Sequence, residues 1–225
     1  MAGYWVDAAA VGFFVLEWLV YALTLEHTAY GRDSLSARMH VYREIWVRNL
    51  LGREARMVDM QIMASLQNGT AFFASTSLIA IGGGLTLLRA TSDAIAVLGT
   101  LPFNLSPSPA LWEMKCVGLI LIFIYTFFKF AWAYRLFNYV AILFGAMPPA
   151  SERDTPEAEA HVVRTTRVFE NAGQHFNRGQ RAFFFALAYL GWFISPWVLF
   201  VTTAAVVIVI WRRQFASNAW QAMGS

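Results

Sequence analysis

The chain has 225 residues, of which 58% are hydrophobic and only 14% are charged. A soluble domain usually carries about 25% charged residues, so the composition excludes an ordinary water-soluble protein and indicates a membrane protein. The net charge is only +3, and the arginines stand in segments that also carry Glu and Asp, so we expect no nucleic-acid partner.

Four segments are long and apolar enough to cross a bilayer core, which takes about 20 helical residues. The third is about 55 Å long at helical rise, so we expect it to tilt or to project into water. The fourth contains Pro196, which removes a backbone hydrogen bond and predicts a kink. The sequence predicts an all-α polytopic membrane protein with one integral domain over residues 1–225. The four spans are about 4–25, 57–88, 111–147 and 182–211.

Two polar segments, 26–56 and 148–181, contain six and five arginines. We expect amphipathic helices in both, with Ser34 as the N-cap of one and Thr155 as the N-cap of the other, ahead of a proline in the first turn. The positive-inside rule places both segments in the cytoplasm of a bacterial inner membrane and both termini outside. The two arginines that follow the last span argue against this topology but are outnumbered.

Two charges inside the spans are candidates for a pore or binding site. Glu17 lies about 18 Å into the first span at helical rise, and Lys129 lies equally deep if the third span enters lipid near Val117. An intramembrane charge usually faces a partner or a water-filled cavity, so we predict a Glu17–Lys129 pair, as a structural clasp more readily than as a proton relay. If the third span begins at Leu111 instead, Lys129 lies near the inner surface and can snorkel. Asp7, near the outer end, is expected to face headgroups.

A second group of candidates lies near the inner interface. Arg135, Asn138 and Tyr139 share one helical face by their i, i+3, i+4 spacing. They could form a site for an anion or a lipid headgroup. The simpler alternative is a boundary arginine that pairs with an acid such as Asp59 or Glu170.

The segment GQHFNRGQR, residues 173–181, marks another junction between polar and apolar sequence. His175, Asn177 and Arg181 could line a cavity mouth or bind a phosphate headgroup, or they could form an interfacial turn whose cations lie among lipid phosphates. The four histidines lack metal-ligand spacing, and the single Cys116 excludes a cysteine cluster. We expect neither a metal nor a cofactor. Because no catalytic motif is found, we do not expect an enzyme.

Three blocks, TAFFASTSLIAIGGGLTLL, FKFAWAYRLFNYVAILFGAMP and FNRGQRAFFFALAYLGWFISPW, occur in this order along the chain. On these blocks the sequence resembles the family known as domain of unknown function 599, over residues 56–200. The resemblance implies a single-domain membrane protein with four helices. It implies no activity and transfers no catalytic residue.

Three functions are consistent with these features. The first is a homo-oligomeric channel or transporter for a small ion or solute, with Glu17 and Lys129 in its polar lining. The second is an accessory or scaffold subunit that binds a protein partner or anionic lipid headgroups. The third and weakest is a lipid-modifying enzyme that uses polar groups at the inner interface.

Overall fold

The computed structural model describes residues 2–99 and 108–223, and every regular element within those ranges is a helix. Four helical stretches in the described part are long and apolar enough to cross a membrane. The expected all-α class with four potential spans is therefore confirmed. These stretches are Trp5–His27, Met57–Arg89, Pro109–Gly145 and Pro196–Ala222.

Serine and threonine caps fix several helix starts. The hydroxyl of Ser34 accepts a hydrogen bond from the backbone N–H of Ala37, and Thr155 accepts one from Ala158. Both predicted N-caps are thus confirmed. The described helices are α1 (Ala2–His27), α2 (Ala29–Arg32), α3 (Leu35–Asn49), η1 (Leu50–Gly52), α4 (Met57–Arg89), α5 (Thr91–Gly99), α6 (Pro109–Gly145), η2 (Ala150–Glu152), α7 (Pro156–Tyr189), α8 (Gly191–Ile194), α9 (Pro196–Phe215) and α10 (Asn218–Ala222).

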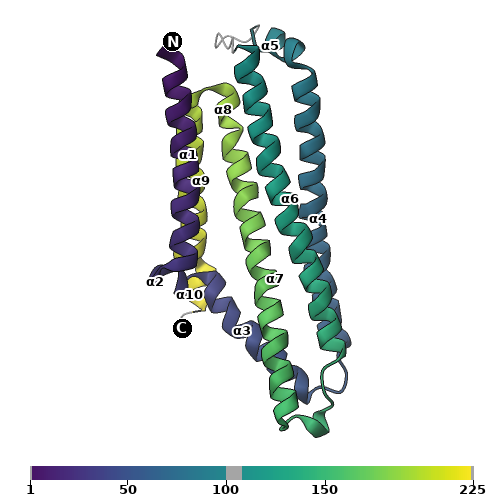
Figure 1. Ribbon diagram of the computed structural model, residues 1–225. Coiled ribbons are helices and arrows are strands. Elements are labelled where there is room, and N and C mark those ends of the chain that lie inside the picture. The colour runs from purple at the N-terminus through teal and green to yellow at the C-terminus, as the bar shows by residue number, and fades with distance from the viewer. Residues whose placement is uncertain (1, 100–107, 224–225) are drawn as a thin grey trace.

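Helix α7 occupies the centre of the bundle, with α4 and α6 on one side and the pair α1 and α9 on the other (Figure 1). One core lies among α1, α6, α7, α8 and α9 and is rich in aromatic rings, including Phe14, Phe185 and Trp192. A second core joins α3, α6 and the first half of α7 around Phe144 and Phe169. We call the part of the molecule beyond the end of α1, with α3 and the first half of α7, the basic half.

Helix α3 runs obliquely from the end of α1 towards the start of α7 (Figure 1). At its far end the guanidinium of Arg48 donates two hydrogen bonds to the carboxylate of Glu159 on α7, at 2.7 and 2.8 Å. This contact attaches the first arginine-rich segment to the second.

Residues 182–211 do not form a single span, because the chain reverses direction between α7 and α9. Arg213 donates a hydrogen bond of 2.8 Å to Gln180, and the Thr202 hydroxyl contacts the carbonyl oxygen of Ala188 at 2.8 Å. Side chains on either side of Pro196 therefore lie at the same height. Helix α7 also continues without a break from the expected cytoplasmic segment into the expected fourth span.

The reversal has a local cause at the junction of α8 and α9. Ser195 is extended and caps α9 by accepting a hydrogen bond from Val198, and Pro196 occupies the first turn. A proline in that position supports a helix start, because the missing N–H would have no intrahelical partner there. The predicted kink at Pro196 is therefore wrong. Gly191 permits the tight return, since a Cβ there would lie 2.6 Å from the Thr202 hydroxyl.

The reversal changes the expected position of the C-terminal end. Helix α10 lies beside α2 and α3, where the indole of Trp220 donates to the carbonyl oxygen of Asp33 at 2.7 Å and Arg38 donates to the carbonyl oxygen of Trp220 at 2.8 Å. The C-terminus thus lies at the arginine-rich end, while the start of α1 lies at the opposite end (Figure 1). The expectation that both termini lie opposite the arginine-rich segments does not hold for the C-terminus.

This arrangement predicts the result of labelling single cysteines with a membrane-impermeant maleimide. We expect Ala219→Cys and Glu157→Cys to react from one side of the membrane and Trp5→Cys to react from the other, in right-side-out and inverted vesicles. Cys116 is buried and leaves a silent background. Labelling of positions 5 and 219 from the same side would contradict the reversal.

Candidate functional site: an arginine-lined cavity

A cavity of about 330 Å³ lies where α1, α3, α7 and α9 meet, at the boundary between the apolar spans and the basic half. Its roof is apolar and comes from the last turns of α1 and from α7 and α9. Its remaining walls are polar and carry four arginines. The lining residues are Tyr21, Leu25, Glu26, His27, Gly31, Ser34, Ser36, Ala37, His40, Arg43, Glu170, Gln174, Asn177, Arg178, Gln180, Arg181, Phe184, Ile210, Arg213 and Gln214.

Glu26 holds two of these arginines. Its Oε1 atom accepts hydrogen bonds from Arg178 Nε at 3.0 Å and from Arg181 Nη2 at 2.6 Å, and its Oε2 atom accepts one from Arg178 Nη2 at 2.8 Å. Charge-assisted hydrogen bonds of this kind are about twice as strong as neutral ones. They connect the end of α1 to the middle of α7.

Arg43, on α3, has no hydrogen bond or ion pair with any described residue. Its guanidinium carbon lies 5.7 Å from the centre of the Phe169 ring and packs against Gly173, where a Cβ would lie 3.0 Å from it. Burial lowers the pKa of the Arg43 guanidinium, and Glu170 acts in the opposite direction. The Arg43 guanidinium is accessible from the cavity, where its N–H groups can donate hydrogen bonds to water or to a bound anion.

The other polar groups of the wall form a second network. Asn177 donates to the Ser36 hydroxyl at 3.3 Å, which in turn contacts the Gln214 side-chain oxygen at 3.2 Å. Arg213 contacts only the neutral Gln180 among described hydrogen-bond partners. Another close contact joins the imidazole of His40 to the carboxylate of Glu170.

The charges of the lining do not balance. Four guanidinium groups face two carboxylates, those of Glu26 and Glu170. With its histidines neutral, the cavity therefore carries an excess of two positive charges. An electropositive cavity between low-dielectric walls concentrates anions.

Two of the predicted site residues, Asn177 and Arg181, line this cavity, whereas His175 does not. The His175 ring lies 6.4 Å from the Trp132 ring, and its Nδ1 atom is buried without a hydrogen-bond partner among the described residues. The segment 173–181 is an uninterrupted part of α7, so the expected interfacial turn is absent.

Arg135 and Tyr139 contact each other, whereas Asn138 contacts α4, and the predicted anion site at these residues stays a prediction. Arg135 donates a hydrogen bond of 2.7 Å to the Tyr139 hydroxyl, while Asn138 accepts one of 2.7 Å from Gln67 on α4. The proposed pairing of Arg135 with an acid is also not formed. Asp59 is hydrogen-bonded to Trp46 and Arg53, and Glu170 contacts His40.

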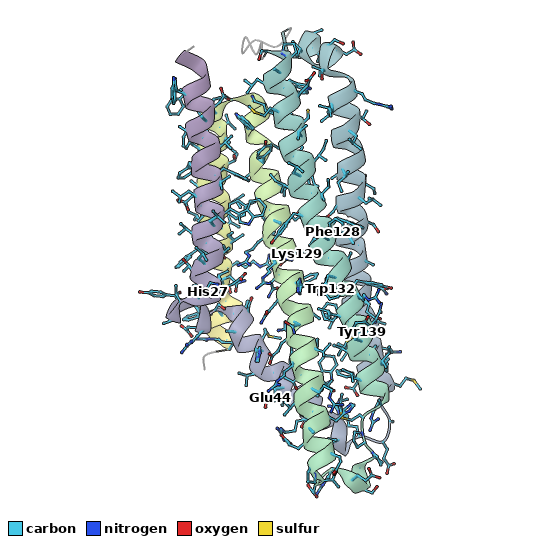
Figure 2. All side chains as sticks on the ribbon, viewed as in Figure 1. His27, Glu44, Phe128, Lys129, Trp132 and Tyr139 are labelled. Atoms are coloured by element: carbon cyan, nitrogen blue, oxygen red, sulfur yellow. The ribbon has the colours of Figure 1, made fainter. Side chains whose placement is uncertain are left out.

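The predicted Glu17–Lys129 pair is not formed. The Lys129 ammonium lies 5.1 Å from the centre of the Tyr125 ring, and the charged groups that act on it are Arg178 and Glu26. Lys129 lies near the height at which α1 ends at His27 (Figure 2). Glu17 is about 15 Å from that end of α1 at helical rise, which explains why the two do not meet.

Lys115 is a deeply buried cation among the described residues, and its role was not predicted from the sequence. Its side chain is only 4% exposed, and its Nζ atom donates a hydrogen bond of 2.7 Å to the carbonyl oxygen of Trp192. The indole of Trp192 donates in turn to Asp7 Oδ1 at 2.6 Å. Asp7 is therefore buried against α8 and does not face headgroups as expected. Asp7 and Lys115 stand near the ends of apolar segments. Their positions in the sequence gave no indication that Trp192 links them.

These features define a helical bundle with four potential membrane spans and a basic cavity at one end of the apolar part. Residues 9–219 match the family described as Protein of unknown function, DUF599, and the chain belongs to that family. No significant match was found among curated proteins or among solved structures.

The buried network at the far end of the bundle predicts coupled effects on stability. Asp7→Asn keeps the acceptor for Trp192 but removes the negative charge near Lys115, and should lower the free energy of unfolding by about 1–3 kcal/mol. Lys115→Met should also destabilise the protein. The double variant should be more stable than the sum of the two losses predicts, by about 1 kcal/mol.

Unfolding in detergent, followed by tryptophan fluorescence, measures these differences. Glu17→Gln is the matched control, because Glu17 is partly exposed on the same helix and has no ion pair among the described residues. Additive effects of the two substitutions would show that Asp7 and Lys115 do not interact.

Proposed function

We propose that this protein binds an anionic lipid headgroup in the arginine-lined cavity and acts as an accessory or scaffold protein of the membrane. The observation that carries the proposal is Arg43, a partly buried guanidinium in the cavity wall without an acceptor among the described residues. A ligand oxyanion would supply that acceptor.

The position of the cavity supports a lipid as the source of the anion. It lies at the end of α1, close to the point where α9 also leaves the apolar part of the bundle. Tyr21, Leu25 and Ile210 provide an apolar roof above the polar wall. A lipid headgroup and the glycerol region next to it have the same spatial order, in which a charged part is followed by an apolar part.

A channel or transporter receives less support from this arrangement. The rings of Phe14, Trp18, Phe185 and Tyr189 pack against one another between α1 and α7, at centroid distances of 5.2 to 5.9 Å. Such packing disfavours a polar path through that part of a single copy. Conduction between copies in a homo-oligomer stays a prediction.

A lipid-modifying enzyme, the third hypothesis, would use the same cavity. The contact between His40 and Glu170 is a feature that could serve it, because a carboxylate can orient an imidazole for proton transfer. A protein partner at the basic half stays a prediction as well.

Binding can be measured with the full chain in nanodiscs by native mass spectrometry after lipid exchange. We expect anionic lipid to be retained over phosphatidylcholine. Arg43→Gln and Arg213→Gln should each weaken retention about tenfold, since each removes a charge-assisted hydrogen bond to the ligand.

Arg167→Gln is the matched control, because Arg167 is exposed on α7 and does not line the cavity. It should leave retention unchanged. An equal loss in this control would show that general surface charge attracts the lipid. Equal retention of neutral and anionic lipid would overturn the proposal.

A further inference from the structure

We propose that the cavity selects a phosphomonoester dianion over a phosphodiester monoanion, and that Glu26 is the internal carboxylate which the ligand displaces. The inference rests on the proposed function and adds the chemical class of the ligand and the way in which it is selected. It is carried by the hydrogen bonds of Glu26, the unpaired Arg43 and the charge of the wall.

Glu26 already occupies the position of an oxyanion. Both of its oxygens accept hydrogen bonds from guanidinium groups, and Oε1 bridges Arg178 and Arg181. An incoming anion must therefore either use Arg43 and Arg213 alone or replace this carboxylate.

Replacement does not require the rupture of a fully buried ion pair. The side chain of Glu26 is 29% exposed and that of Arg178 is 31% exposed, whereas that of Arg181 is 13% exposed. Glu26 also stands in the last turn of α1, next to its terminal residue His27. Figure 2 shows His27 at this end of α1, beside the turn that leads into α2.

The charge of the wall favours the dianion. The cavity has an excess of two positive charges, and a phosphomonoester carries about −1.5 to −2 at pH 7 with three terminal oxygens. Displacement of Glu26 raises the excess to three, and a dianion that contacts Arg43 and the released arginines lowers it to about one. A phosphodiester carries a single charge, which equals that of the carboxylate it would have to replace, so it gains little from the exchange.

Two lipids of different headgroup chemistry test this selection. Nanodiscs of phosphatidylcholine contain either phosphatidic acid, a monoester, or phosphatidylglycerol, a diester, at the same mole fraction. We expect the full chain to retain the monoester about tenfold more strongly than the diester. In Glu26→Gln neither lipid has to displace a carboxylate, so retention of both anionic lipids should rise by about tenfold while the preference for the monoester remains.

Glu152→Gln is the matched control, because Glu152 is exposed and does not line the cavity. It should leave the retention of both lipids unchanged. If Glu26→Gln does not fold, Glu26→Asp keeps the charge but shortens the reach to the arginines. This variant should raise the retention of both lipids by a smaller factor than Glu26→Gln does.

The outcomes separate this inference from the proposed function. Equal retention of both anionic lipids by the unmodified chain would overturn the selection and leave headgroup binding intact. Retention of neither lipid, together with no thermal stabilisation by inorganic phosphate, would overturn both. Stabilisation by inorganic phosphate without lipid retention would support the dianion site and assign it to a soluble phosphate. Unchanged retention of both lipids in folded Glu26→Gln would show that Glu26 does not compete.

Discussion

The hydrogen bonds of Glu26 to Arg178 and Arg181 determine how α1, with its neighbour α9, packs against α7. Helix α1 is apolar over most of its length, and apolar contacts between helices in lipid have little directional preference. The carboxylate fixes one height of α1 along α7, because only at that height do its oxygens reach both guanidinium groups. The same height brings α3 and the end of α9 to the cavity, so this contact contributes to the shape of the site before a ligand binds.

Helices α6 and α7 are longer than a bilayer core requires, so the basic half is a continuation of the same helices that build the apolar part. A ligand bound in the cavity would contact α1 and α9 at the apolar roof and α3 and α7 at the polar walls. Binding would then stabilise one arrangement of these helices relative to the others, by an amount set by its preference for that arrangement. Accessory membrane proteins can use such a link, because it joins the occupancy of a headgroup site to the shape of a water-exposed surface.

Local sequence signals predicted the helices. They did not predict which helices contact one another. The apolar segments and the caps at Ser34 and Thr155 were found because each depends on neighbouring residues. Ser195 and Pro196 repeat the pattern of Thr155 and Pro156, and this signal could have revealed the reversal that the hydropathy of 182–211 concealed. Glu26 was missed because it follows the predicted end of the first span, and its arginine partners are more than 150 residues away.

The two lysines of α6 show why depth along one helix does not define the environment of a charge. Lys115 is near a helix end but buried by α1 and α8, whereas Lys129 is mid-helix and close to the point where α1 ends. The polar contacts of α1 to its neighbours therefore lie at two levels, Asp7 and Glu26, about 28 Å apart at helical rise. That distance matches a hydrocarbon core of about 30 Å, so the two polar networks would lie at its two boundaries if α1 spans a membrane. Glu17 is the acid of α1 that lies between these two levels. A role in transport would therefore require a partner for Glu17 in another copy of the chain or in the lipid.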